Sequence, residues 1–246
     1  MEKLECVLVM PAYNEGECIE KVVTSWSHSL STIVGPGRFK MVIVNDGSKD
    51  DTGKILDKMA LSNSSLVVVQ QLNAGHGAAL LNAYRKGIEL KPDSIFHVDS
   101  DDQFLPSDFQ KFWQAREKSK FILGWRMVRH DAFHRLVITR ILRTVIFLFF
   151  GAYIKDANVP YRLIERSYLE RLLAQLPVGI FAPNIFLSVL ACRGGQNLMS
   201  IPVVHEDRKT GVVSIVRWNL IKVCLRSLRE LLNFRLTLNS RLKNLC

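Results

Sequence analysis

Apolar and polar positions alternate along the first hundred residues in a way that predicts strands and helices in turn. Short apolar runs bounded by polar loops are typical of buried strands. We expect such strands at 6–10, 41–44, 66–70 and 94–98, the first ending at Pro11. Apolar residues at helical spacing predict helices at 17–29, about 50–62 and 78–89. This alternation implies an α/β fold, with a mostly parallel central sheet flanked by helices.

Polar clusters directly follow all four predicted strands. Each cluster alone is usually a plain turn. In parallel sheets, however, ligands bind outside the carboxyl ends of the strands, and four such clusters would meet there. They are Tyr13–Glu15, Asn45–Ser48, Asn73–Gly77 and Asp99–Gln103.

The last cluster has the donor set of a metal site. Asp99, Asp101 and Asp102 place three carboxylates within four residues, which is costly without a cation. Asp99, Asp101 and Gln103 project to one side if strand geometry persists, and their hard oxygens suit Mg²⁺ or Mn²⁺. The alternative is an exposed acidic turn that caps a helix after Pro106.

The net charge of +10 over 246 residues is unevenly distributed. Residues 1–117 carry a net −4, residues 118–155 carry +7, and residues 214–246 carry +6. The basic segments are interleaved with aliphatic residues and show no nucleic-acid docking motif, so an anionic ligand or a membrane surface is favoured over nucleic acid. With 48% hydrophobic residues, the chain is not disordered.

The cysteines and the apolar runs indicate the environment in which the protein works. The five cysteines form no C-x-x-C pair, which favours a reducing compartment. No secretory signal opens the chain, and the longest apolar run, 145–154, is too short to span a bilayer. P-loop and nucleophile-elbow motifs are absent, and Gly75-x-Gly77 is weak evidence for a dinucleotide site.

Together the four clusters resemble family 2 glycosyltransferases of GT-A fold. The motifs are Pro11–Glu15, Val44–Ser48 with Asp51–Thr52, Asn73–Gly77 and Asp99–Gln103. Within that family, the polyprenol-phosphate sugar transferases, such as dolichol-phosphate mannosyltransferase, are the most similar. The resemblance implies a catalytic domain at 1–213, a membrane-associating tail at 214–246 and a nucleotide-sugar donor.

The resemblance also implies roles for individual residues. Nucleotide-binding residues would be Pro11, Ala12, Tyr13, Asn14, Glu15, Asp46, Gly75, Gly77, Asp99 and Arg208. Asp99, Asp101 and Gln103 would bind the metal, which stabilises the departing diphosphate. Catalytic residues would be Asp99, Asp101, Arg126, Arg135 and Asp156.

The basic segment 118–155 resembles the family's acceptor site. Arg126 matches the arginine of Gly-x-Arg, and Arg135 with Thr139 matches Arg-x-x-x-Ser/Thr, which implies that these three hold the acceptor phosphate. Arg135 and Thr139 share one helix face, and arginine donates bidentate hydrogen bonds to phosphate. A solvated basic helix face is the alternative.

Three positions depart from the family pattern. Pro160 replaces a glycine between Asp156 and Arg162. Asp156 could support the acceptor site, and Arg162 could equally be a structural ion-pair partner. The segment from His205 resembles a mobile Arg-x-x-Gly-x-Ser segment with one extra residue before the serine. Asn184 stands where many relatives have an acidic residue, and a largely dianionic phosphate acceptor needs little deprotonation. We therefore hypothesise inverting attack without an essential protein base.

The tail reads as a basic amphipathic helix at 218–234. Lys222, Arg226 and Arg229 form one stripe beside leucines, a pattern that lies in a bilayer interface. The helix could instead pack on the catalytic domain or on a partner helix. Segment 145–154 is either a second interfacial element or core.

These observations favour a metal-dependent hexosyltransferase, bound peripherally to the cytoplasmic face of a membrane, that moves one sugar onto a polyprenyl or dolichyl phosphate. The donor could be GDP-mannose or a UDP-hexose. A saccharide or lipid hydroxyl acceptor, a non-catalytic nucleotide-sugar-binding subunit and an NAD dehydrogenase are the alternatives. A homo-oligomer or a membrane-protein partner is left open.

Overall fold

The computed structural model describes residues 3–127, 133–195, 198–207 and 217–245, and the side chains of all of these except 133–137 and 217–224. Seven strands form one sheet in the order β3-β2-β1-β4-β6-β5-β7. Their bounds are β1 Cys6–Ala12, β2 Phe39–Asp46, β3 Leu66–Gln71, β4 Ser94–Val98, β5 Phe121–Arg126, β6 Tyr161–Glu165 and β7 Leu198–Val203.

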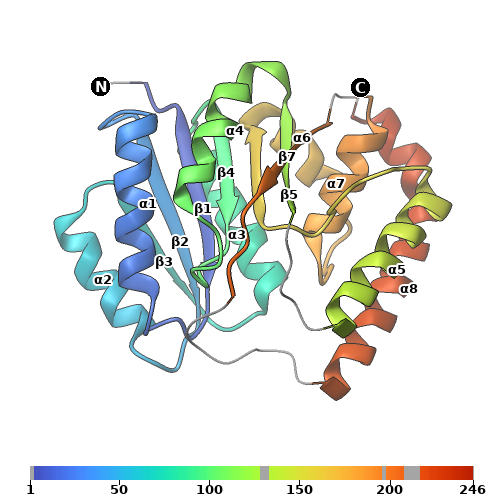
Figure 1. Cartoon of the computed structure of the whole chain (residues 1–246), viewed down its shortest axis with the longest axis horizontal. Helices are drawn as coiled ribbons and strands as arrows, with labels where there is room; N and C mark the ends of the chain where they lie inside the picture. Colours follow the sequence, from blue (N-terminus) through green and yellow to red (C-terminus); the bar gives the residue numbers. More distant parts are fainter. Residues whose placement is uncertain (1–2, 128–132, 196–197, 208–216, 246) are drawn as a thin grey trace.

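The sheet is parallel except at one strand. β6 runs antiparallel to both β4 and β5, and β1 to β4 run parallel in neighbouring pairs, as do β5 and β7. The mostly parallel sheet predicted from the sequence is confirmed. The carboxyl ends of the parallel strands therefore lie along one edge, at the bottom of Figure 1.

Helices cover both faces of the sheet (Figure 1). The α-helices are α1 Ile19–Ile33, α2 Thr52–Ser62, α3 His76–Glu89, α4 Phe109–Ala115, α5 Phe133–Phe150, α6 Arg166–Ala174, α7 Pro183–Arg193 and α8 Arg217–Lys243. Two short 3₁₀ turns, Pro106–Asp108 and Arg116–Lys118, flank α4. α1 contacts α2 and α4 in one layer, while α7 contacts α3, α6, α5 and α8 in the other.

Strand alternation separates an aromatic layer from a polar one. Phe96 of β4 and Tyr161 of β6 face α1 and α4, with ring centroids 4.8 Å apart and Trp26 at 5.3 Å from Phe96. The next residues, His97 and Arg162, are register partners and turn to the opposite face, where His97 lies 5.5 Å from the ring of Tyr84 on α3. Two polar side chains are thus fully buried at the centre of the sheet.

The first strand does not end at Pro11, as the sequence suggested, but runs to Ala12. β1 pairs with β4 only as far as Val9 and His97. Beyond that point the Pro11 carbonyl accepts a hydrogen bond from the Ser100 hydroxyl at 2.9 Å. Proline, which has no backbone N–H to donate, is tolerated there because β1 and β4 are no longer paired at this position.

Two other boundaries also differ from the sequence prediction. β2 continues through Asn45 and Asp46, because both pair in register with β3. α3 begins at His76, so His76 and Gly77 form its first turn rather than a loop. As a result, Asn45 and Asp46 lie in a strand, and His76 and Gly77 lie in a helix.

The C-terminal segment forms one helix, α8, longer than the predicted 218–234. Leu231, Phe234 and Leu238 are buried, and the Phe234 ring lies 5.0 Å from Phe186 of α7 and 6.1 Å from Phe150 of α5. One face of α8 therefore packs on the rest of the domain, which was one alternative for this helix. Segment 145–154 also has two sides. Ile146, Phe150 and Ile154 are buried, whereas Phe147, Leu148, Phe149 and Tyr153 are exposed.

Among the residues that the structure describes, no helix has the length and apolar character needed to cross a bilayer.

Candidate functional site

The loops that follow β1 and β2 are joined by hydrogen bonds. The Asn14 N–H donates to the Ser48 hydroxyl, and the Lys49 N–H donates back to Asn14 Oδ1, at 2.9 and 2.8 Å. The Glu15 N–H donates to the Thr52 hydroxyl at 2.9 Å. Asn14 has a φ of +54°, which asparagine tolerates better than most residues. Residues far apart in the sequence thus form one rigid rim at the carboxyl ends of β1 and β2.

Asp46 holds the loop between β3 and α3. Its carboxylate accepts hydrogen bonds from the backbone N–H groups of Ala74 and Gly75, at 2.8 and 2.9 Å, and from Gln71 Nε2 at 2.6 Å. Its backbone carbonyl accepts a hydrogen bond from the Asn73 side chain. Asp46 is buried at 2% exposure, so its direct partners are residues of its own chain.

This arrangement predicts a measurable stability loss in Asp46→Ala. Removing three hydrogen bonds to a carboxylate should lower the free energy of unfolding by about 1–2 kcal/mol, since Ala74 and Gly75 are exposed and water can replace part of the loss. Urea denaturation measures this. Asp57→Ala, which removes one exposed contact to Gln70, is the control and should change stability by less than about 0.5 kcal/mol. Equal effects in the two variants would contradict the account.

Asp99 lies directly after β4, between two histidines. Its Oδ1 atom lies 3.4 Å from His97 Nε2 and 3.8 Å from His76 Nε2. Burial raises the pKa of Asp99, but the nearby His76, His97 and Arg126 outweigh that effect and leave the pKa below its ordinary value. Burial lowers the pKa of His97 to about 4, so His97 is neutral at pH 7. The site therefore presents an ionised carboxylate beside a neutral imidazole.

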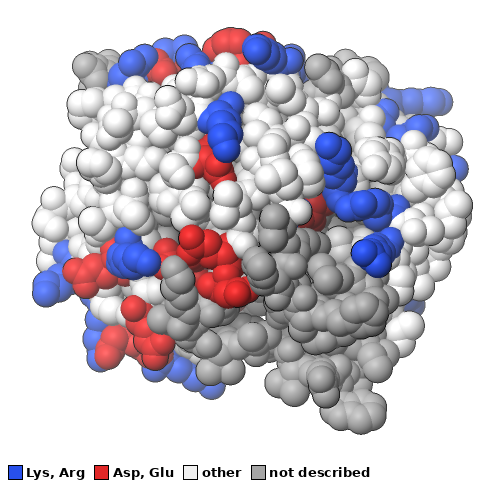
Figure 2. Space-filling view, viewed as in Figure 1, with Lys and Arg blue, Asp and Glu red and all other residues white. Residues whose placement is uncertain are grey.

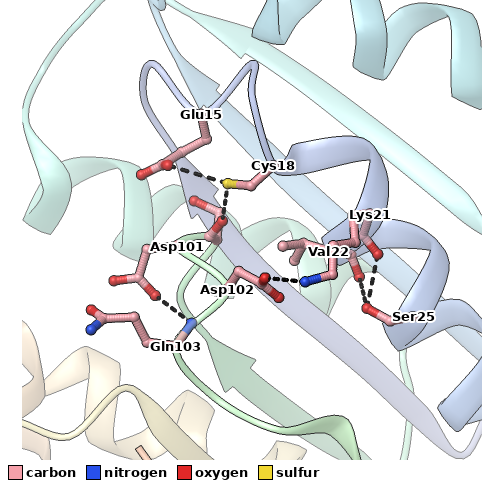
Figure 3. Close-up of polar contacts among 9 residues, drawn as sticks. Glu15, Cys18, Lys21, Val22, Ser25, Asp101, Asp102 and Gln103 are labelled. Atoms are coloured by element: carbon pink, nitrogen blue, oxygen red, sulfur yellow. Dashed lines mark hydrogen bonds and ion pairs between the residues drawn. The ribbon is translucent and has the colours of Figure 1, made fainter. Parts of the chain in front are cut away.

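Residues 99–103 turn instead of continuing the strand. β4 ends at Val98, and Asp102 has a φ of +58°. Figure 3 shows the result, in which Asp102 turns toward Lys21 of α1, with Oδ2 2.5 Å from Nζ, and Asp101 lies on the other side with Gln103. The strand geometry assumed for the metal ligands is therefore wrong, although Asp101 and Gln103 do lie together.

Gln103 forms hydrogen bonds with Glu206, which follows β7 in the chain. Its side-chain nitrogen donates to the Glu206 carbonyl, and the Glu206 N–H donates to the Gln103 carbonyl, both at 2.9 Å. Asp101 Oδ1 accepts a hydrogen bond from the Gln103 N–H at 3.4 Å.

Cys18 connects the loops that follow β1 and β4. Its thiol donates to the Glu15 carboxylate and to the Ser100 carbonyl, both at 3.5 Å (Figure 3). The β1 and β4 loops thus meet at this point.

Asp99 and Asp101 bring two carboxylates to the edge of the sheet, which are donors of the kind that a divalent cation prefers. The Asp99 side chain is 24% exposed, and its buried Oδ1 has no hydrogen-bond partner in the part of the chain that the structure describes. Within that part, no three His, Cys, Asp or Glu side chains form a metal-binding group. Two carboxylate oxygen donors suit a hard ion that keeps open positions for phosphate oxygens.

Arg126 and Asp156 form a bidentate pair at the end of β5. Arg126 Nε lies 2.8 Å from Asp156 Oδ2, and a terminal nitrogen lies 3.1 Å from Oδ1. The two side chains are 13% and 6% exposed. Two candidate acceptor residues are thus brought together, and Asp156 fixes the plane of the guanidinium.

Arg162 is fully buried and organises the loop that contains Pro160. Its guanidinium donates to the carbonyls of Ala157, Val159 and Asn184 and to the Ser188 hydroxyl, at 2.6–3.4 Å. No carboxylate forms an ion pair with Arg162 among the described residues, where carbonyl oxygens accept its hydrogen bonds instead. Burial lowers the pKa of this group. The loop conformation at Pro160 depends on these hydrogen bonds.

Asn184 occupies the start of α7 at 4% exposure. Its Oδ1 atom is buried and has no hydrogen-bond partner among the described residues.

Of the other predicted residues on the basic segment, Thr139 is half-buried on α5. The Arg135 side chain, Arg208 and the glycine and serine of the mobile segment, Gly211 and Ser214, lie outside the described residues.

Acidic side chains gather at one place on the face drawn in Figure 2. They lie near the carboxyl ends of β1 and β4, with some Lys and Arg side chains beside them, and a separate group of Lys and Arg side chains lies toward the side that carries α5 and α8.

The model of the family described as Glycosyl transferase family 2 matches residues 7–173. The chain belongs to glycosyltransferase family 2. This confirms the resemblance carried by the four motifs.

Curated relatives of this glycosyltransferase are moderately similar. Polyprenol monophosphomannose synthase of Mycolicibacterium smegmatis is 26% identical over 216 residues, covering 84% of this chain and 79% of that protein. UDP-N-acetylglucosamine–dolichyl-phosphate N-acetylglucosaminyltransferase of Methanococcus voltae is 26% identical over 217 residues, with 80% and 83% covered. Undecaprenyl-phosphate 4-deoxy-4-formamido-L-arabinose transferase of Klebsiella pneumoniae is 23% identical, with 83% of this chain but 60% of that protein covered.

A solved structure shares the fold of this glycosyltransferase. Glucosyl-3-phosphoglycerate synthase from Mycobacterium tuberculosis, in complex with Mn²⁺, UDP-glucose and phosphoglyceric acid, superimposes with a TM-score of 0.69 at 18% identity, covering 94% of this chain and 80% of that one. The predicted GT-A fold is thereby confirmed.

Proposed function

We propose that this glycosyltransferase transfers one hexose from a nucleotide-sugar to a polyprenyl or dolichyl phosphate at the surface of a membrane. The observation that carries the proposal is the ionised Asp99 beside Asp101, at the carboxyl edge of a family 2 sheet, with the buried Arg126–Asp156 pair on the same edge. By their names, one curated relative is a synthase of polyprenol monophosphomannose, and the two others are transferases for dolichyl phosphate and undecaprenyl phosphate. The donor is GDP-mannose or a UDP-hexose.

The donor site is proposed at the rim formed by β1, β2 and α3. Pro11, Ala12, Tyr13, Asn14 and Glu15 would contact the base and ribose. Asp46 would act by holding the Asn73–Gly75 loop, with Gly75 and Gly77 at the start of α3. Arg208 would close over the diphosphate.

Asp99 and Asp101, with Gln103 beside them, would hold Mg²⁺ or Mn²⁺. When bound there, a divalent cation would supply positive charge to stabilise the departing nucleoside diphosphate. A neighbour of the same fold was crystallised with Mn²⁺. Because the pKa of Asp99 is lowered, Asp99 is available as a carboxylate at neutral pH.

The acceptor phosphate is proposed to bind beside Arg126, with Arg135 and Thr139 contributing from α5. Asp156 would position Arg126, whose remaining N–H donors would then face the phosphate. A phosphate oxygen would attack the anomeric carbon in line, with inversion. The phosphate is largely dianionic at neutral pH, so the uncharged Asn184 in place of an acid is compatible with attack by phosphate.

The membrane-facing surface is proposed on α5 and α8, which contact each other. Leu148, Leu225 and Leu236 are 71%, 62% and 85% exposed, next to exposed Arg140, Arg143, Arg229 and Arg235. Exposed apolar side chains flanked by arginines suit the interface of an anionic bilayer. Residues 214–246 would then be a membrane-associating tail on the 1–213 catalytic domain, facing the cytoplasm.

Substitutions on α8 test this surface. Leu225→Ser with Leu236→Ser should weaken binding to phosphatidylcholine–phosphatidylserine vesicles about tenfold or more, because two leucines lose their burial among acyl chains. Vesicle sedimentation measures the effect. Leu61→Ser, at an equally exposed leucine on α2, is the control and should bind normally. Unchanged binding in the double variant would exclude this surface.

A thermal-shift panel tests donor use. GDP-mannose, UDP-glucose and UDP-N-acetylglucosamine are added to the purified protein, each with and without MnCl₂. A selective stabilisation that requires Mn²⁺ identifies the donor. The absence of any shift, with wild-type and Asp101→Asn proteins behaving alike, would contradict the proposal.

A further inference from the structure

Two side chains of α8 bind the loop that leads into α7. Glu230 Oε2 accepts a hydrogen bond from the Phe181 N–H at 3.0 Å, and Glu230 Oε1 accepts one from Arg226 Nε at 2.8 Å. Arg226 also donates to the Gly179 carbonyl at 3.1 Å, and its guanidinium lies 5.4 Å from the centre of the Phe181 ring. Residues 179–181, which we call the bridging loop, are therefore held at both ends by α8.

The bridging loop packs directly against the first turn of α3. A Cβ atom at Gly77 would overlap the Phe181 carbonyl oxygen and would lie 3.1 Å from that of Ile180. Backbone thus touches backbone, with no side chain between them to absorb a shift. A displacement of the bridging loop would therefore reach α3.

The first turn of α3 forms one wall of the candidate donor site. Next to it, the Gly75 N–H donates to the buried Asp46 carboxylate at 2.9 Å. His76, one residue further, lies 3.8 Å from Asp99 Oδ1. A continuous series of contacts consequently runs from α8 through the bridging loop to Asp99.

The α8 end of this series is firmly anchored. Leu231 and Phe234, within one turn of Glu230, are buried at 2% and 1% exposure. The Glu230 side chain is only 19% exposed, so its hydrogen bonds are partly shielded from water. Leu225 and Leu232 lie on the exposed side of the same helix turns.

We propose that Arg226 and Glu230 are positioning residues for donor binding: α8 holds the first turn of α3, through the bridging loop, in the geometry that accepts the nucleotide-sugar. This inference rests on the proposed function, because it takes that turn as part of the donor site. The same helix then carries the proposed membrane-facing surface on one side and the support of the donor site on the other.

Donor affinity in α8 variants tests the inference. Calorimetric titration with GDP-mannose and with UDP-N-acetylglucosamine, in MnCl₂ and without lipid, is carried out on wild type, Glu230→Ala and Glu230→Gln. Glu230→Ala should bind the donor about 5- to 10-fold more weakly, a loss the size of one ordinary net hydrogen bond. Glu230→Gln keeps an oxygen for the Phe181 N–H and should lie between the two. Asn233→Ala, at an exposed α8 position, should bind as wild type does.

Steady-state kinetics separate positioning from mere stabilisation. In Glu230→Ala, KM for the donor should rise about 5- to 10-fold, with a change of less than about twofold in KM for undecaprenyl phosphate. If Glu230→Ala does not fold, Arg226→Ala, at a half-exposed side chain, carries the same expectation. A variant with a lowered Tm but wild-type donor affinity would overturn the inference and leave the proposed function intact. Failure of the wild type to bind any nucleotide-sugar would overturn both.

Discussion

Asp101→Asn should reduce sugar transfer by about 10²-fold or more while leaving the fold intact. The substitution keeps the size and polarity of a half-buried side chain, so the expected loss concerns charge at the edge of the sheet. Loss of the charge on one of the two carboxylates should also weaken the effect of MnCl₂ on nucleotide binding. Initial rates at saturating donor and nucleotide titrations with and without MnCl₂ provide the measurements.

Asp102→Asn is the matched control, one residue away. Asp102 is directed at Lys21 and has a φ of +58°, a conformation that asparagine also accepts. Its rate should stay within about threefold of wild type, because the exposed ion pair with Lys21 contributes little. Equal losses at Asp101 and Asp102 would show that the acidic turn acts only through its summed charge and would contradict the assignment of Asp101.

Arg162→Met should destabilise the domain by about 3 kcal/mol or more. The side chain keeps much of its volume. In this fully buried setting, however, the Val159 carbonyl loses its guanidinium donors, and the carbonyls of Ala157 and Asn184 keep the Ser188 hydroxyl but lose Arg162. Urea denaturation of wild type and Arg162→Met measures the difference in the free energy of unfolding. A variant too unstable to accumulate as folded protein would also agree with the prediction.

Arg166→Met provides the comparison for that loss. Arg166 also donates to a carbonyl, that of Pro92, at 3.0 Å, but its side chain is 34% exposed, and the pair with Glu170 lies at the surface. We expect about 1 kcal/mol or less. If the two arginine variants were equally stable, Arg162 would not be holding the Pro160 loop.

The sheet and the motif positions could be predicted because they follow from local patterns. Apolar runs and helical spacing identify β1 to β4 and α1 to α3, and parallel connections force their loops to one edge. The boundaries were missed where tertiary pairing extends an element, as at Asn45 and Asp46, which pair with β3. Propensity alone makes both of them turn residues.

The contacts within the site could not be predicted, because they join distant parts of the chain. Asp101 and Asp102 are adjacent and chemically alike, yet the positive φ of Asp102 directs the two side chains apart. Arg162 suggested an ion pair, whereas the structure satisfies it with carbonyls of a loop that sequence spacing cannot place. The contact of Glu230 with Phe181 spans 49 residues and leaves no periodic signal.

The most direct measurement is the product formed from the donor identified by thermal shift, with undecaprenyl phosphate and, in parallel, undecaprenol in vesicles. Mass spectrometry distinguishes a sugar joined through a phosphodiester from one joined to a lipid hydroxyl. Transfer to undecaprenyl phosphate, none to undecaprenol, and an inverted anomeric configuration are the predicted results. Transfer to undecaprenol, or donor binding without transfer to either lipid, would contradict the account.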